Sequence, residues 1–163
     1  RFLFIGGGLR KEAARTLADS LGADNIVWLP FQPEETLADS LACCHLSLVS
    51  QRDGLEGIAV PCKLYGILAS GRGILAMVPE DSEVARVVGE EACGVRLAPD
   101  DDAALAAEIS RLASDPEEVR GMGGKAYAAF DRCYRLGHAV AKYRELWEEA
   151  EAVARHRVVG TSG

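Results

Sequence analysis

The segment from Asp53 to Gly71 joins an acidic loop to a helix that we expect to begin at Pro61. Proline suits the first turn of a helix, because its missing N–H has no partner there, and glycine suits the position after the last turn. The N–H groups and positive dipole end of such a first turn attract anions. Glu56 lies just before the helix, and its carboxylate can accept hydrogen bonds from hydroxyl groups. The segment therefore predicts a site for a ligand that carries both phosphates and sugar hydroxyls.

The flanking residues place this segment at the end of a strand. Residues 45–50 are typical of a short buried strand, and residues 72–78 of the next one. Open α/β sheets bind their ligands outside the carboxyl ends of the strands, which is where the loop would lie. The alternative is an ordinary connection, in which Pro61 only starts a helix and Glu56 is a surface charge.

The composition restricts the classes of protein that the chain can belong to. Its 163 residues are 48% hydrophobic, enough for one domain with a buried core, and no apolar run approaches the roughly 18 residues that cross a bilayer. A net charge of −7 argues against nucleic acid as the main partner. The five cysteines are an odd number without a C-x-x-C pair. This pattern disfavours a metal site and a disulfide framework, and it favours reduced thiols in the cytoplasm.

Short apolar runs alternate with amphipathic segments along the chain. Strands are predicted at 2–5, 25–30, 45–50, 72–78 and 95–98. Helices are predicted at 9–21, at 33–42, from Asp81 or Ser82 until Gly94, from the acidic turn 100–102, and from Pro116 to about Arg155 with a break near 136–138. Because parallel neighbours need crossover connections, this order predicts an α/β fold: a Rossmann-like, doubly wound parallel sheet of about five strands with C-terminal helices.

The helical segments also predict which side chains are buried and which residues cap. Ser114 and Glu117 have the spacing of a capping box for the helix that follows them. Tyr143 and Trp147 are expected to pack the last helix against a further surface. The expected buried positions are Val84, Val87 and Val88, then Leu105, Ile109 and Leu112, then Val119, Met122, Ala126, Phe130 and Cys133.

Gly6, Gly7 and Gly8 follow the first strand and suggest a turn whose backbone a nucleotide can approach. An NAD site would require the G-x-G-x-x-G spacing, but position 11 is Lys11, and the second strand ends in 30–32 (Pro-Phe-Gln) without an acid for the ribose. The NAD interpretation is therefore disfavoured, and a simple tight turn stays open as the alternative. The three histidines share no metal-ligand spacing, and the Cys43–Cys44 pair has no evident histidine partner.

Taken in order, these segments resemble the C-terminal, nucleotide-sugar-binding half of a family 4 glycosyltransferase of the GT-B fold. The resemblance covers roughly residues 1–150, and its matching segments are 2–8, 25–31, 56–61, 63–65, 68–71 and 82–84. It implies that Glu56 contacts a hydroxyl of the donor sugar. The sugar and the diphosphate would be held by the helix N-terminus and by the loop amides of Gly57, Ile58, Ala59 and Val60.

The resemblance implies further contacts and one departure. Gly6, Gly7, Gly8 and the loop after Phe31 would border the nucleotide, while Arg52 and Lys63 are the nearest candidates for phosphate charge. The second glutamate of the family's motif, which is expected to bind the ribose, falls on Leu64. No metal and no cofactor is expected, because the donor is a UDP- or GDP-sugar. No catalytic base can be named.

The implied reaction transfers a hexose-type sugar to a polysaccharide or lipid-linked acceptor, with retention of anomeric configuration. Residues 1–157 would form the donor-binding domain, without its first strand, and 158–163 a loose tail. An acceptor-binding half would lie upstream, so we expect the chain alone to be inactive, cytoplasmic, and bound to membranes only through that missing half. The alternatives are a non-catalytic nucleotide-binding module or subunit and an NAD- or flavin-binding Rossmann domain.

Overall fold

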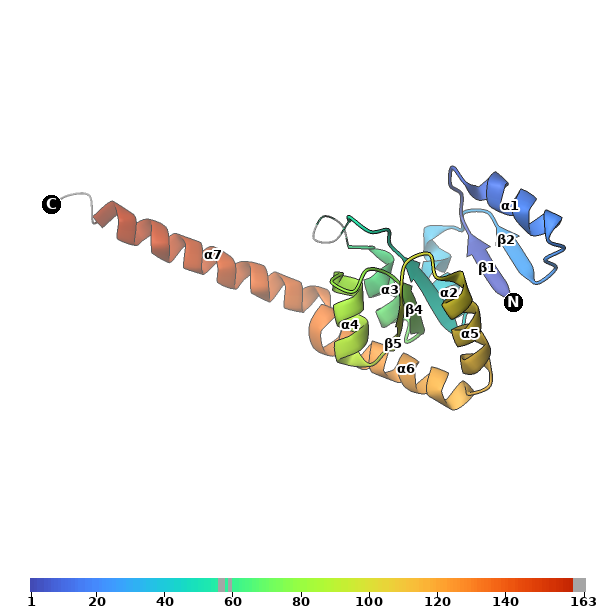
Figure 1. Cartoon of the computed structure of the whole chain (residues 1–163). Helices are drawn as coiled ribbons and strands as arrows, with labels where there is room; N and C mark the ends of the chain where they lie inside the picture. The colour runs from blue at the N-terminus through green and yellow to red at the C-terminus, as the bar shows by residue number, and fades with distance from the viewer. Residues whose placement is uncertain (56–57, 59, 160–163) are drawn as a thin grey trace.

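The computed structural model describes residues 1–55, 58 and 60–159, with side chains as far as 151. Strands and helices alternate along most of the chain (Figure 1). Their bounds are β1 Phe2–Ile5, α1 Lys11–Ser20, β2 Ile26–Leu29, the 3₁₀ turn Glu34–Thr36, α2 Leu37–Ala42, β3 Leu46–Ser50, α3 Lys63–Ala69, β4 Gly73–Met77, α4 Glu83–Glu91, β5 Gly94–Leu97, α5 Asp102–Ala113, α6 Pro116–Ala129, the π-helical turn Phe130–Tyr134, and α7 Leu136–Val159.

The strands of the described chain are all parallel to their neighbours and form two sheets. β1 pairs with β2, with Phe2 opposite Ile26, while the second sheet has the order β3-β4-β5, with Leu46 opposite Gly73 and Ile74 opposite Gly94. The predicted α/β fold with five parallel strands is confirmed. The strands are divided two and three rather than joined in one ladder.

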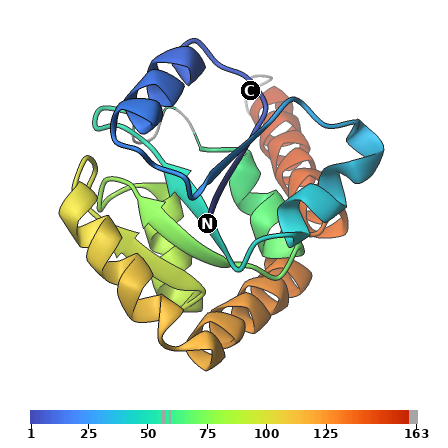
Figure 2. The ribbon, with the colours of Figure 1, turned by 90° about the vertical axis from the view of Figure 1, so that its right-hand side faces the viewer.

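The core lies on both faces of the three-stranded sheet, because successive side chains of a strand point to opposite faces. On one face, Ile74, Ala76 and Val78 pack with buried residues of α3, α4 and α6. On the other face, Leu75 packs with Leu112 of α5 and Met122 of α6. Helices therefore cover both faces of this sheet, as a doubly wound fold requires (Figure 2). The buried positions predicted in α4 and at Leu112, Met122 and Ala126 are confirmed.

The two-stranded sheet is much less covered. All four residues of β1 are exposed, and of the described residues in α1 only Ala18 is buried. Phe4 stacks on Trp28 of β2 with ring centroids 4.7 Å apart, and the Arg15 guanidinium lies over the same indole ring. These contacts hold the β1–α1–β2 unit together from within, and its outward apolar surface stays in contact with solvent.

The two ends of α3 differ from each other in how closely they follow the sequence prediction. The helix begins at Lys63 with Cys62 as its N-cap residue, two positions after the expected start at Pro61. At its other end Gly71 has a φ of +64°, its N–H donates to the Leu68 carbonyl, and the Arg72 N–H donates to the Ile67 carbonyl. This pair of bonds is a Schellman motif, so the predicted stop at Gly71 is confirmed.

Two predicted helix ends are wrong by one or two residues. α4 ends at Glu91, and its C-cap residue Ala92 has a φ of +47°, the left-handed conformation expected of glycine, while Gly94 begins β5. A Cβ on Gly94 would lie 2.0 Å from the Ile74 carbonyl oxygen, so the strand contact requires glycine there. α6 is capped by Asp115, whose carboxylate accepts the Glu118 N–H at 2.9 Å, and Ser114 instead ends α5.

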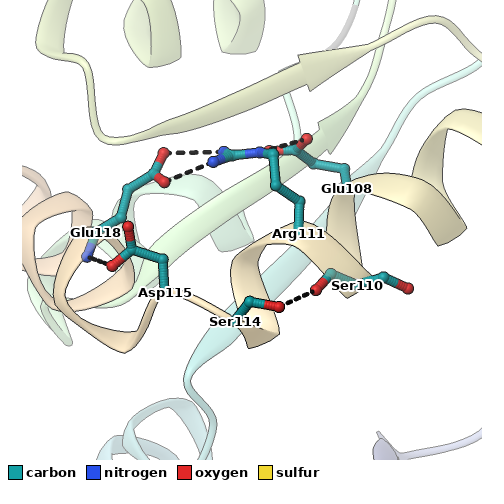
Figure 3. A network of polar contacts seen from close by, with 6 residues as sticks. All are labelled: Glu108, Ser110, Arg111, Ser114, Asp115 and Glu118. Carbon is teal, nitrogen blue, oxygen red and sulfur yellow. Dashed lines mark hydrogen bonds and ion pairs between the residues drawn. The ribbon is translucent and has the colours of Figure 1, made fainter.

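Surface ion pairs join α5 to α6. The Arg111 guanidinium lies between Glu108 at 2.7 Å and Glu118 at 2.6 Å, beside the Asp115 cap (Figure 3). Beyond the π-helical turn, α7 extends away from the rest of the molecule (Figure 1). Tyr143 and Trp147 of α7 are exposed, so no surface formed by the described residues covers these two side chains, contrary to the expectation that they pack the last helix.

Candidate functional site

The glycine turn that follows β1 has a backbone that ordinary residues rarely adopt. Gly6 has a φ of +112° and Gly8 a φ of +148°, conformations open to glycine because it has no Cβ. The Gly6 N–H donates to the Leu29 carbonyl of β2 at 3.1 Å, which extends the ladder by one bond into the turn. The turn thus lies at the carboxyl end of β1, where the sequence placed it.

The ring of Phe31 packs directly over this turn. A Cβ on Gly6 or on Gly7 would come within 3.1 Å of the Phe31 ring, so the two glycines make room for the aromatic side chain. The side chain is nevertheless 80% exposed. The structure therefore brings together three of the predicted nucleotide contacts, Gly6, Gly7 and Phe31, and it leaves the outer surface of the ring accessible.

Lys11 holds the same turn and was not predicted to belong to it. Its ammonium donates to the Gly6 carbonyl at 2.6 Å and lies 3.4 Å from the Leu29 carbonyl. The lysine thus ties the turn to the end of β2. Its position in the first turn of the following helix is the one sequence signal that could have drawn attention to it.

The second candidate region is the loop between β3 and α3. Gln51, directly after β3, is buried, and its amide donates to the Leu55 carbonyl at 3.1 Å. The Gln51 N–H also donates to the Met77 carbonyl of β4, and the Ile58 N–H to the Leu55 carbonyl. The first half of the loop is therefore anchored to the end of the sheet by a buried polar side chain.

The predicted ligand-binding residues of this loop are exposed where the structure describes them. Arg52, Ile58 and Val60 have exposed side chains. Lys63 is exposed as a whole, but partial desolvation lowers the pKa of its ammonium group, an effect that the charge of Cys62 opposes. Glu56, Gly57 and Ala59 lie outside the described residues, so the central prediction for Glu56 is not tested by the structure.

The helices that follow the two candidate turns begin without a side-chain cap. In the described part of the chain, no side chain accepts a hydrogen bond from the first turn of α1 or of α3. The short helix α2 also lacks a side-chain cap. By contrast, Ser82, Asp101 and Asp115 cap α4, α5 and α6. Among the described residues, therefore, no side chain competes for the N–H groups of the first turn of α3.

Other residue types that could carry chemistry are not gathered into a site. Within the residues that the structure describes, no group of three or more His, Cys, Asp or Glu side chains could hold a metal ion. Burial raises the pKa of the Cys93 thiol to about 11, which keeps it protonated and unreactive at neutral pH. None of the described helices is both long and apolar enough to cross a bilayer.

Comparison with known proteins supports the resemblance found in the sequence. No family model matches the chain. A probable glycosyltransferase, WbjE of Pseudomonas aeruginosa, is 26% identical over 133 residues, which are 82% of this chain. Sucrose-phosphate synthase from Thermosynechococcus elongatus superposes on 93% of the chain with a TM-score of 0.76 and 17% identity. The chain carries part of a GT-B fold. The predicted resemblance to a GT-B glycosyltransferase is thereby confirmed.

The matches cover only part of these two proteins. The chain spans 33% of the length of WbjE and 38% of the length of the sucrose-phosphate synthase. Both proteins therefore contain further polypeptide that has no counterpart in these 163 residues. The activity of such a longer protein can therefore be proposed only for a whole protein that contains this chain.

Proposed function

We propose that the chain is the donor-binding part of a glycosyltransferase that takes its sugar from a nucleoside diphosphate sugar. The observation that carries the proposal is the similarity to WbjE over 82% of the chain. The geometry is compatible with it, since a glycine turn and an anchored loop follow strands of parallel sheets. The donor base, UDP or GDP, is left open, and the acceptor is proposed to be a glycan or a lipid-linked sugar.

In this proposal the diphosphate binds at the loop that precedes α3. The developing negative charge of a leaving diphosphate needs fixed dipoles, and uncapped N–H groups at a helix start supply them without rearrangement. Lys63 adds a positive charge there, and a bound anion would raise its lowered pKa towards the ordinary value. The exposed ring of Phe31 offers an apolar surface on which a nucleotide base can stack.

Glu56 would orient the donor sugar, so its contribution can be separated from that of the phosphates. We expect Glu56→Gln to weaken binding of the UDP- or GDP-sugar by roughly tenfold, since one charge-assisted hydrogen bond is lost, and to leave binding of UDP or GDP alone unchanged. Calorimetric titration measures both affinities. Glu149→Gln, in the exposed part of α7, is the matched control and should change neither. Equal loss for sugar and bare nucleotide would remove Glu56 from the sugar site.

The location of the diphosphate can be tested with two exposed cysteines of the chain. Cys62 is the N-cap residue of α3, whereas Cys43 ends α2. UDP or GDP should slow alkylation of Cys62 several-fold and leave alkylation of Cys43 unchanged, because a bound diphosphate would cover the start of α3. Mass spectrometry of the modified peptides gives both rates. Equal rates for Cys62 with and without nucleotide would exclude this location.

Two other functions stay open and are distinguished by simple measurements. A non-catalytic module would bind the nucleotide sugar, yet the longer protein that contains the chain would transfer no sugar. If the longer protein is active, Glu56→Ala should reduce its turnover by ~10²-fold or more, provided that the carboxylate acts mainly in the transition state.

An NAD- or flavin-binding domain would be stabilised against thermal unfolding by NAD or flavin and not by UDP or GDP. Retention, a cytoplasmic location and membrane association through a missing half stay predictions.

A further inference from the structure

Lys11 bonds to the glycine turn from both ends. Its ammonium donates to the Gly6 carbonyl at 2.6 Å, and its backbone N–H donates to the Gly8 carbonyl at 3.1 Å. One residue therefore holds the peptide groups on either side of Gly7. Gly6 is buried and Lys11 is half-buried, and a hydrogen bond from a charged donor is stronger where water is partly excluded.

The same ammonium also reaches the end of β2. It lies 3.4 Å from the Leu29 carbonyl, which accepts the Gly6 N–H at 3.1 Å. Only Pro30 separates Leu29 from Phe31, and its ring fixes one of the backbone angles between them. Lys11 therefore contacts both backbone segments that determine where the Phe31 side chain begins and what it packs on.

The position of the Phe31 ring depends on this arrangement. A Cβ on Gly6 or on Gly7 would lie 3.1 Å from a ring atom, so the ring rests directly on the backbone of the turn. The side chain is 80% exposed, which means that few other atoms restrain it. A change in the conformation of the turn should therefore change the position of the ring.

The location of Lys11 in its helix does not favour a lysine. It is the first residue of α1, where the positive end of the helix dipole opposes a cation. In a dinucleotide-binding fingerprint this position is a glycine, which lets the helix approach the strand closely. Here two carbonyl oxygens compensate for the unfavourable dipole. The contacts with the turn therefore account for the lysine, and the helix does not.

We propose that Lys11 is a positioning residue for the nucleotide: its ammonium fixes the glycine turn, and the turn fixes the Phe31 ring on which the base of a UDP or GDP group stacks. The ligand in this inference rests on the proposed function, whereas the contacts of Lys11 do not. Lys11 acts through Phe31 and touches no phosphate. A direct contact with the diphosphate is the alternative that the experiment must exclude.

A double-mutant cycle on the 163-residue chain tests the proposal. Lys11→Met keeps an apolar stem and removes the ammonium, and Phe31→Ala removes the ring. In calorimetric titrations with UDP and with GDP, each single change should weaken binding of the nucleotide that the parent binds by roughly tenfold. The double variant should bind no more weakly than Phe31→Ala, because without a ring the ammonium has nothing to position. A contact between Lys11 and phosphate would instead make the two losses multiply.

Two further measurements separate positioning from charge and from stability. Arg10→Met removes the same charge from the neighbouring, exposed residue and should leave both affinities nearly unchanged. Thermal unfolding without ligand reports stability, which a merely structural role would lower without any coupling to Phe31 in the affinities. If Lys11→Met fails to fold, Lys11→Gln replaces it in the cycle.

The outcomes distinguish this inference from the proposed function. A parent chain that binds neither UDP nor GDP would contradict the proposed function, and this inference with it. Nucleotide binding that Lys11→Met leaves unchanged, losses that multiply in the double variant, or an equal loss in Arg10→Met would overturn the inference alone.

Discussion

Gly123 and Gly124 are neighbours in α6 with opposite surroundings. A Cβ on Gly123 would lie 2.3 Å from the carbonyl oxygen of Gly71, so α6 contacts the end of α3 backbone to backbone. A Cβ on Gly124 would meet nothing within 4 Å. The close approach to Gly71 therefore requires glycine at position 123. At position 124 glycine has no packing role and only destabilises the helix through its greater conformational entropy in the unfolded chain.

The two glycines should respond to alanine with opposite signs. Gly123→Ala should lower the free energy of unfolding by about 3 kcal/mol, because backbone atoms must move apart to admit the methyl group. Gly124→Ala should raise it by about 0.5–1 kcal/mol, because alanine favours the helix and has room there. Urea unfolding of both variants and the parent measures the difference. Similar values for the two variants would show that α6 does not approach Gly71 closely.

Single residues were predictable where their role is local. The glycine turn and Phe31 could be placed together because each follows a strand directly. The role of Lys11 could not, because its two carbonyl partners at Gly6 and Leu29 come together only when β1 pairs with β2. Glu56 stays a prediction, since it lies outside the described residues.

The end of α5 and the start of α6 test which residue caps a helix. Asp115→Ala should cost about 1 kcal/mol, since its carboxylate accepts the Glu118 N–H and also favours the positive helix end. Ser114→Ala should cost much less, because the Ser114 hydroxyl donates only to the Ser110 carbonyl at the end of α5 (Figure 3). Thermal unfolding of the two variants compares them. A larger loss for Ser114→Ala would restore the capping box predicted from the sequence.

The ion pair between α5 and α6 should make stability depend on pH. The hydrogen bond with Arg111 lowers the pKa of Glu118 below its ordinary value. A lowered pKa in the folded state stabilises the protein above the unfolded pKa of about 4.3, and this contribution is lost as the pH falls through the folded value.

Glu118→Gln should therefore be less stable than the parent at pH 7, and the difference should vanish as the pH is lowered past the folded pKa. Urea unfolding at several pH values measures it. Glu117→Gln is a suitable control, because Glu117 pairs with Arg120 only within α6 and is fully on the surface. A stability difference for Glu118→Gln that persists unchanged in acid would exclude the ion pair as its cause.

The existence and type of the elements were predicted, but their ends were less predictable. The last helix was expected to end at about Arg155, with a loose tail from residue 158, whereas α7 extends to Val159. Strand and helix periods are carried by local sequence, which explains why each predicted strand is present. Ser114 and Asp115 are both good capping residues, and their roles depend on where α5 stops. Likewise Gly94 suits a helix stop, but the contact with Ile74 places it in β5, and the left-handed position falls on Ala92.

At the scale of the whole molecule, the two sheets should differ in stability. β4 is buried on both faces, whereas β1 is exposed along its length and, among the described strands, pairs with β2 alone. We expect protection factors from amide hydrogen exchange to be roughly tenfold or more lower at Phe2 and Phe4 than at β4 amides that bond to β3 or β5. Equal protection would mean that both sheets open only in global unfolding. The sequence could not predict this division, because a strand pattern identifies strands but not their neighbours.

α7 has a further consequence for how the protein moves in water. A helix of 24 residues is about 36 Å long, more than twice the roughly 14 Å radius of gyration expected for a compact body made of the residues before it. Since α7 extends outward, it adds friction with little mass (Figure 1). The monomer should therefore sediment more slowly than a sphere of 17.4 kDa and tumble anisotropically.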